Sequence, residues 1–169
     1  DIIVSGTLGD HAATVMAARH NLTLPPEIQS DSAPLCHLTA AMLAAAPSIA
    51  VLRDPTRGGV AASLNELAGA AGVGILLDEA AIPVHPAVQG VCDILGFDPL
   101  TLANEGKLLA FVPPEDTARV LAVMHADPHG RGACVIGHTT AEASGSVGLR
   151  TALGGIRIVD LPLGELVPR

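Results

Sequence analysis

The sequence contains almost no aromatic side chains: among 169 residues there is no Trp, no Tyr and only two Phe, Phe97 and Phe111. It is also poor in positive charge, with 9 Lys and Arg against 17 Asp and Glu and a formal net charge of -8. Proteins that bind single-stranded nucleic acid stack bases on aromatic rings, and a phosphate backbone favours a basic surface. Both absences argue against a nucleic-acid partner.

Long hydrophobic runs are absent too. The longest, residues 38–52, is too short to span a bilayer and is interrupted by Pro47. No signal peptide is recognisable, so we expect a cytoplasmic protein without a membrane partner. The chain begins without Met, which suggests a piece of a longer protein.

Motifs for metal binding and disulfides are also missing. Cys36, Cys92 and Cys134 form no CxxC pair and are predicted to be reduced thiols of the core. His125 and His129 have the spacing of a helical metal pair, but the intervening Pro128 would disturb the helix. We therefore predict no metal site.

Aliphatic residues are abundant: 49% of the chain is hydrophobic and the mean hydropathy is +0.48, as expected for one folded domain. Periodicity and turn signals predict strands and helices that alternate at first, with hairpins toward the end. The predicted strands are residues 1–6, 48–54 (buried), 74–79, a part of 100–113, 133–140, 146–151 and 154–162. The predicted helices are residues 13–21, 34–46 (capped by Ser32), 60–71, 85–96 and 114–127. The expected fold is α/β (α+β), a mixed, largely antiparallel sheet with helices packed on it.

The motif DPTRGG, residues 54–59, lies between a predicted strand and a predicted helix. Gly58 and Gly59 permit positive φ, and the following helix offers unpaired N–H groups to an anion. Arg57 suits phosphate or carboxylate, and Asp54 can orient that arginine or hold a metal. The alternative is a tight turn in which Thr56 or Asp54 caps the helix and Arg57 is solvated.

Two further motifs have polar residues at element junctions. Asp10 and His11, in GTLGDH, stand at a helix start, although an N-cap aspartate and a surface histidine would also explain them. In NEGK, Glu105 is a candidate general base, with Lys107 or Asn104 positioning a polar substrate; the alternative is a solvated turn. If the sheet brings all three motifs to one rim, they form a polar surface suited to anions.

The ordered set SGTLGDH, LRDPTRGG, LANEGK and LPLGELVPR resembles the C-terminal half of the hydrogenase maturation proteins HypE. That family belongs to the aminoimidazole ribonucleotide synthetase (PurM-like) superfamily. The resemblance implies a PurM-like C-terminal domain at residues 1–159 and a C-terminal tail at 160–169. The family's ATP-binding N-terminal domain and its terminal Ile-Cys are missing from the sequence.

The resemblance also implies an activity, that of an ATP-dependent carbamoyl dehydratase. Such an enzyme converts its own C-terminal S-carboxamide cysteine to a thiocyanate, which supplies the cyanide ligands of [NiFe] hydrogenase. The implied partners are a HypF-type carbamoyl transferase and a HypC–HypD-type scaffold complex, with homodimerisation through the missing N-terminal domain. ATP and Mg²⁺ would serve the full-length protein, and neither would bind the fragment alone, which is expected to be inactive.

By the same resemblance, Glu105 is the proton acceptor that faces the modified cysteine, supported by Asn104 and Lys107. The residues expected to line the nucleotide and phosphate cleft are Asp54, Thr56, Arg57, Gly58, Gly59, Asp10 and His11. One alternative is a kinase or synthetase of the same superfamily acting on a small substrate, of the selenophosphate or thiamine-phosphate type. Another is a non-enzymatic docking module that presents a mobile tail, residues 161–169, to partner proteins.

Overall fold

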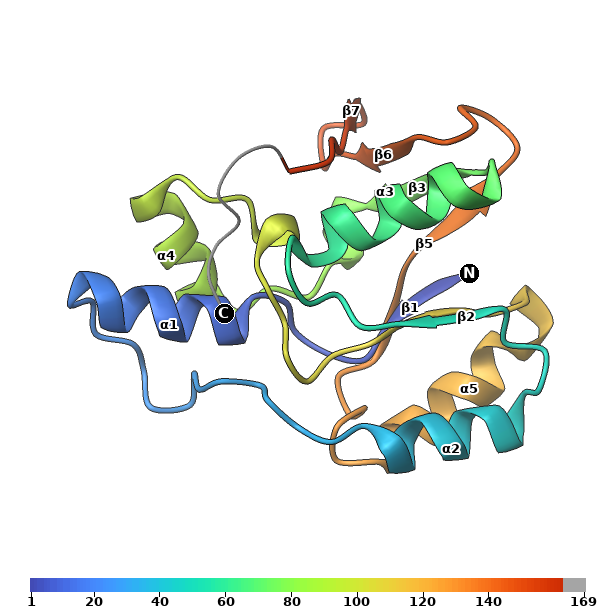
Figure 1. Ribbon diagram of the computed structural model, residues 1–169, viewed down its shortest axis with the longest axis horizontal. Helices are drawn as coiled ribbons and strands as arrows, with labels where there is room; N and C mark the ends of the chain where they lie inside the picture. The colour runs from blue at the N-terminus through green and yellow to red at the C-terminus, as the bar shows by residue number, and fades with distance from the viewer. Residues whose placement is uncertain (163–169) are drawn as a thin grey trace.

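The computed structural model describes residues 1–162. In this part of the chain seven strands form one sheet, and five α-helices pack around it (Figure 1). The strands are β1 (Ile2–Val4), β2 (Val51–Arg53), β3 (Gly74–Asp78), β4 (Leu109–Phe111), β5 (Cys134–Thr140), β6 (Val147–Arg150) and β7 (Ile156–Ile158). The helices are α1 (Asp10–His20), α2 (Cys36–Ala45), α3 (Gly59–Ala71), α4 (Pro86–Leu95) and α5 (Pro114–Ala126). Two short 3-10 helices, η1 (Glu79–Ala81) and η2 (Pro99–Thr101), complete the described elements.

The sheet has the strand order β2-β4-β1-β5-β3-β6-β7. All neighbouring strands are antiparallel except β3 and β6, which run parallel with Ile75 opposite Val147. The prediction of a mixed, largely antiparallel sheet is therefore confirmed. The expected hairpin at the end of the chain is confirmed as well, since β6 and β7 are antiparallel neighbours.

Helices cover both faces of the central strands. Successive side chains of a strand point to opposite sides, so neighbouring residues of one strand contribute to different core clusters. Ile2 and Val4 of β1 belong to the same core cluster as Leu64 of α3. Ile3 belongs instead to a cluster with Met42 of α2 and Met124 of α5. Figure 1 shows the resulting layers, with α3 on one side of the sheet and the pair α2 and α5 on the other.

A third apolar cluster lies beside the sheet, where α1 packs against α4. Its members include Ala13 of α1, Val88 of α4 and the segment Leu102 and Ala103 that leads into the NEGK motif. This packing fixes the start of α1 and the NEGK segment relative to each other, because both contribute fully buried side chains to one cluster.

Several element predictions need correction. Helix α2 begins at Cys36 with Leu35 as N-cap residue, and Ser32 does not cap it: the Ser32 N–H bonds Ser30 Oγ at 3.3 Å, because residues 30–33 turn toward the NEGK motif. The strand predicted at 48–54 is shorter and is not buried, since β2 forms a sheet edge and pairs with β4 alone.

The cysteine prediction holds for two residues and is wrong for the third. Cys36 is exposed on α2, whereas Cys92 is buried and Cys134 is half-buried. Burial, together with the negative charges of Asp93 and Asp98, raises the pKa of Cys92 to about 11, and burial also raises the pKa of Cys134. Both thiols therefore remain protonated and unreactive near neutral pH.

The part of the chain that the structure describes contains no helix long and apolar enough to cross a membrane. The predicted tail spans residues 160–169, and positions 163–169 of it lie outside the described residues.

Candidate functional site

Asn104 links the three motifs that the sequence singled out. Its side chain is fully buried; Oδ1 accepts a hydrogen bond from the Gly9 N–H at 2.8 Å, and Nδ2 donates to the Pro55 carbonyl at 3.2 Å. The Asn104 backbone N–H also donates to the Pro55 carbonyl. Because Gly9 belongs to GTLGDH and Pro55 to DPTRGG, all three motifs meet at one place, which the sequence had left open.

The two helices at this junction both begin at a glycine with left-handed backbone. Gly9 (φ 83°) precedes α1 and Gly58 (φ 78°) precedes α3, and neither helix start has a side-chain cap. Gly59 follows with φ 61°, and a Cβ there would lie 2.5 Å from the carbonyl oxygens of Leu100 and Leu102. Because glycines occupy both N-cap positions, none of Asp10, Asp54 and Thr56 is the N-cap residue of these helices. The absence of side-chain caps favours an external anion at these helix starts.

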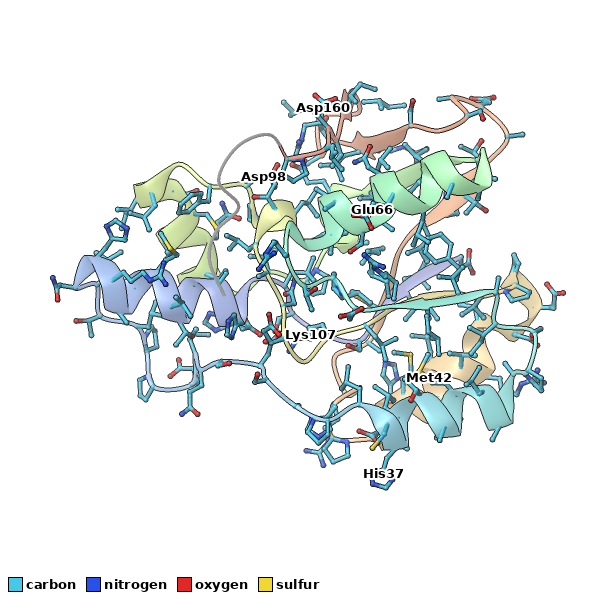
Figure 2. The ribbon with its side chains drawn as sticks, in the orientation of Figure 1. His37, Met42, Glu66, Asp98, Lys107 and Asp160 are labelled. Atoms are coloured by element: carbon cyan, nitrogen blue, oxygen red, sulfur yellow. The ribbon has the colours of Figure 1, made fainter. Side chains whose placement is uncertain are left out.

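Lys107 forms the centre of a small charged cluster. Its ammonium lies 3.6 Å from Asp10 Oδ2 and 3.5 Å from Asp31 Oδ2, and the Asp31 side chain is only 2% exposed. Thr7 donates its hydroxyl to Asp10 Oδ2. Figure 2 shows Lys107 in the middle of the molecule, close to the start of α1. Two carboxylates compensate the one ammonium, so Lys107 is not a free cation for a phosphate.

Several buried polar atoms of this cluster make no hydrogen bond within residues 1–162. They are Asp10 Oδ1, His11 Nε2 and Asp31 Oδ2. Native structures pair nearly all buried polar groups, so such atoms indicate a site that a ligand, water or another protein segment completes. His11 is held through its other ring nitrogen, which lies 2.8 Å from Ser30 Oγ.

The remaining polar residues of DPTRGG lie at the surface of the junction. Arg57 and Asp54 are exposed, and neither takes part in an ion pair within the described residues. Thr56 is half-buried, and its carbonyl accepts the Gly59 N–H at 2.9 Å. Arg57 is thus the cation that this rim leaves available to an anion.

The NEGK turn is largely buried, contrary to the alternative of a solvated turn. Asn104 and Gly106 are buried, Glu105 and Lys107 are half-buried, and a Cβ on Gly106 would lie 1.6 Å from the Asp31 carbonyl oxygen. Sequence analysis missed Asp31 entirely. The signal was its place in a stretch of 15 residues, 21–35, without helix or strand, because such long loops are usually functional.

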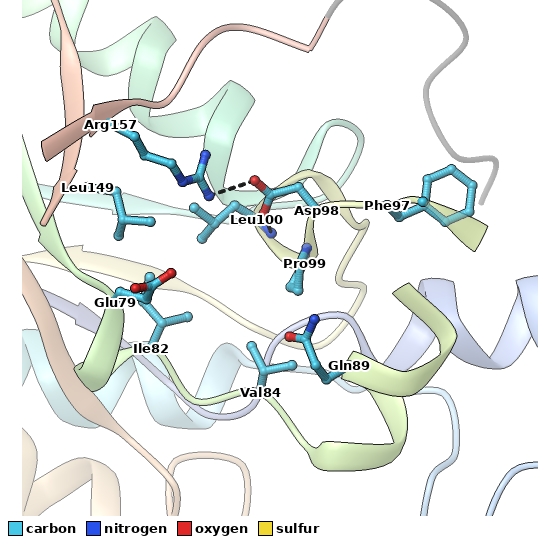
Figure 3. Close-up of a pocket in the computed structure, with 11 residues that line it drawn as sticks. Glu79, Ile82, Val84, Gln89, Phe97, Asp98, Pro99, Leu100, Leu149 and Arg157 are labelled. Carbon is cyan, nitrogen blue, oxygen red and sulfur yellow. Dashed lines mark hydrogen bonds and ion pairs between the residues drawn. The ribbon is translucent and has the colours of Figure 1, made fainter. Parts of the chain in front are cut away.

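Two cavities differ in their relation to these motifs. One, of about 410 Å³, lies next to the Lys107 cluster and is lined by Thr7, Asp31, Gly106 and Lys107 among others. Another, of about 520 Å³, lies between α4, η2 and β7 and contains none of the motif residues (Figure 3). Its most prominent polar feature is the ion pair of Arg157 with Asp98 at 2.7 Å.

Residues 1–162 contain no group of three or more His, Cys, Asp or Glu side chains arranged to hold a metal ion. The described residues therefore do not form a complete Mg²⁺ site.

Residues 1–150 match the family model described as AIR synthase related protein, C-terminal domain. A curated relative, carbamoyl dehydratase HypE of Rhodobacter capsulatus, is 55% identical over 167 residues, which cover 99% of this chain and 49% of the relative. The corresponding protein of Escherichia coli K12 is 48% identical, with 99% and 49% covered. The chain thus spans about half the length of the curated relatives it matches.

Solved structures give the same result. A crystal structure of hydrogenase maturation protein HypE superposes with a TM-score of 0.95 at 41% identity, covering 99% of this chain and 54% of that one. Similar matches are HypE in complex with ATP (TM-score 0.91, 41% identity, 99% and 51% covered) and a HypE–HypF complex (0.89, 41%, 95% and 52%). Thiamine monophosphate kinase of Aquifex aeolicus, at 19% identity and a TM-score of 0.58 over 90% of this chain and 49% of that one, shares only the fold.

Proposed function

Because this chain belongs to the AIR synthase-related family and matches HypE proteins along 99% of its length, we propose that it is the C-terminal half of an ATP-dependent carbamoyl dehydratase. The observation that carries the proposal is the junction at Asn104, which joins the turn bearing Glu105 to the starts of two helices. A half-buried carboxylate beside a rim suited to anions is what phosphorylation and dehydration of an amide require.

The proposed reaction has two steps on a C-terminal S-carboxamide cysteine. The amide oxygen attacks the γ-phosphorus of ATP, an O–P bond forms, ADP leaves, and the amide nitrogen loses one proton. The C–O bond then breaks, phosphate leaves with the bonding electrons, and the nitrogen loses its second proton as the C≡N bond of the thiocyanate forms. Phosphorylation is needed because an unactivated amide oxygen is a poor leaving group.

Glu105 is the proposed proton acceptor in this sequence. Its backbone N–H is fixed by Asp31 Oδ1 at 3.0 Å, and Asn104 and Lys107, its neighbours in the motif, are held by the contacts described above. Asn104 is proposed to position the motifs and not to contact the reacting atoms. Its side-chain amide is buried, and both its oxygen and its nitrogen already form hydrogen bonds. The starts of α1 and α3, with Arg57, are the proposed contacts of the nucleotide phosphates.

ATP as the co-substrate is supported by the ATP complex of a HypE relative. We assign the Mg²⁺ ligands to the other half of the protein, since residues 1–162 contain no group of three or more His, Cys, Asp or Glu side chains that could hold a metal ion. A HypF-type carbamoyl transferase is the proposed donor of the carbamoyl group, supported by the HypE–HypF complex. Transfer to a HypC–HypD-type scaffold and dimerisation through the N-terminal half complete the proposal.

The test uses the complete protein, with its N-terminal half and terminal cysteine, carbamoylated by its partner and then given ATP. Intact mass should show the loss of one water. Glu105→Gln removes the base at nearly constant shape and should slow that loss by about 10²- to 10⁴-fold. Glu115→Gln, on the exposed first turn of α5, is the matched control and should dehydrate normally.

If the unmutated protein loses no water, the dehydratase proposal fails and the family fold alone remains. Phosphorylation of a small substrate by that protein would then favour the superfamily kinase alternative. Binding of partners without any chemistry would favour the docking module.

A further inference from the structure

The segment of residues 21–35 connects α1 to α2 without helix or strand (Figure 1). Its Asp31 backbone lies against Gly106 of the NEGK turn. One apolar side chain already anchors it: Ile28 is buried in the cluster of α1 and α4. A loop of this length needs no buried carboxylate for anchoring, because an apolar contact achieves the same without a desolvation cost. The burial of Asp31 therefore requires another explanation.

Asp31 contacts all three residues of the sequence Glu105, Gly106 and Lys107. Its Oδ1 accepts the Glu105 N–H at 3.0 Å, and its Oδ2 lies 3.5 Å from the Lys107 ammonium. Its backbone carbonyl oxygen lies so close to Gly106 that a Cβ there would be 1.6 Å away. The turn that carries Glu105 is thus held by one residue from a distant part of the sequence.

The bond from the Glu105 N–H is the important one, because a hydrogen bond to a carboxylate is about twice as strong as a neutral one. It fixes the peptide plane from which the Glu105 side chain starts. The Lys107 ammonium forms an ion pair with Asp31 Oδ2 at 3.5 Å, and it also lies 3.6 Å from Asp10 Oδ2. The orientation of Glu105 therefore depends on a chain of charges that includes the first turn of α1.

We propose that Asp31 is a positioning residue for Glu105: its carboxylate orients the turn so that the Glu105 side chain meets the amide of the substrate. The inference rests on the proposed function, in which Glu105 is the base. Asp31 does not touch the reacting atoms in this proposal. It acts on the rate of proton removal and leaves nucleotide binding and carbamoyl loading unchanged.

The experiment compares Asp31→Asn and Asp31→Ala in the complete protein, carbamoylated by its partner and mixed with saturating ATP in a single turnover. Asn keeps an oxygen acceptor for the Glu105 N–H but loses the charge, whereas Ala removes both. The water-loss rate should fall by about tenfold in Asn and about 100-fold in Ala, the cost expected for a catalytic group displaced by about 1 Å. The Kd for ATP and the extent of carbamoylation should stay within about twofold of the unmutated protein.

Asp78→Ala is the matched control. Asp78 also accepts a backbone N–H, that of Ala80 at 3.1 Å, but it lies at η1, outside the motifs. It should cost less stability than Asp31→Ala, because Asp78 is exposed and holds no ion pair among the described residues, and it should leave the water-loss rate unchanged. A positioning role predicts that the water-loss rate falls from the unmutated protein to Asp31→Asn and further to Asp31→Ala, while ATP binding and carbamoylation stay unchanged. A merely structural role does not predict this separation.

Water loss at the unmutated rate in Asp31→Ala, with Glu105→Gln inactive, would overturn the inference and leave the proposed function intact. A parallel fall of ATP binding, carbamoyl loading and rate would also overturn it, because Asp31 would then only hold the fold together. If Asp31→Ala does not fold, a water-loss rate in Asp31→Asn equal to that of the unmutated protein decides against the inference. Absence of water loss in the unmutated protein would overturn the proposed function itself.

Discussion

At the scale of single residues, the junction depends on an amide that donates and accepts at once. Asn104 accepts from the Gly9 N–H through Oδ1 and donates through Nδ2 to the carbonyls of Pro55 and Leu102. A carboxylate of the same shape can still accept but cannot donate, so it would face two carbonyl oxygens without a hydrogen. The buried charge would be costly, and so would the loss of the side-chain donor to the Leu102 carbonyl; the Pro55 carbonyl would keep only the backbone N–H of residue 104.

Asn104→Asp should therefore lower the free energy of unfolding of this chain by about 2–4 kcal/mol, since buried groups lose their partners and gain a charge. Urea unfolding measures the change. Gln29→Glu makes the same amide-to-carboxylate exchange at an exposed loop position and should shift stability by no more than about 0.5 kcal/mol. Equal effects of the two substitutions would show that Asn104 does not hold the three motifs together.

At the scale of elements, two glycines of α3, Gly59 and Gly69, have different structural roles. Gly59 starts the helix with φ 61° and packs against the backbone of residues 100–102, where it brings the DPTRGG motif next to the NEGK segment. Gly69 lies in the interior of the same helix, is exposed, and has open space where a Cβ would be. The first glycine is required by geometry, and the second only lowers helix propensity.

Alanine at these two positions should change stability in opposite directions. Gly59→Ala combines a left-handed backbone with contacts to two carbonyl oxygens at 2.5 Å and should destabilise by about 3 kcal/mol or more. Gly69→Ala should stabilise by roughly 0.5–1 kcal/mol through helix propensity. Thermal and urea unfolding of both variants provide the comparison, and a Gly59→Ala protein as stable as the unmutated one would contradict the close packing described.

At the scale of the whole molecule, the site has buried polar groups that the described residues do not satisfy. The helix starts lack side-chain caps, and Asp10 Oδ1 and His11 Nε2 are buried without a hydrogen bond in the described part of the chain. The chain spans about half of its curated relatives. We therefore expect the other half of such a protein to complete the site, with the nucleotide between the two.

The isolated chain should accordingly show no ATP turnover, because one rim of a two-sided site cannot bind the metal nucleotide and exclude water. Phosphate release from pure protein is the measurement, with the complete protein as the positive control. Steady release that disappears in Glu105→Gln would contradict the expectation and would place the whole reaction in this half.

The sequence by itself determined the order and type of nearly all elements, because periodicity, glycines and prolines act locally. It also identified Glu105, Arg57 and the two glycine-rich helix starts as candidates, since these residue types suit such chemistry at those positions. It failed at β2, whose exposure depends on a single pairing with β4, and at the cap of α2, where Ser32 bonds Ser30 instead.

Only the tertiary structure decided which distant residues meet. The sequence separates Gly9, Pro55 and Asn104 widely, yet one buried amide joins them. The only local signal for Asp31 was its place in the long loop of residues 21–35, because its role depends on a fold that brings this loop against the NEGK turn. Hydrogen bonds and ion pairs between distant segments are set by the packing of α1, α4 and the sheet, and local patterns contain no information about that packing.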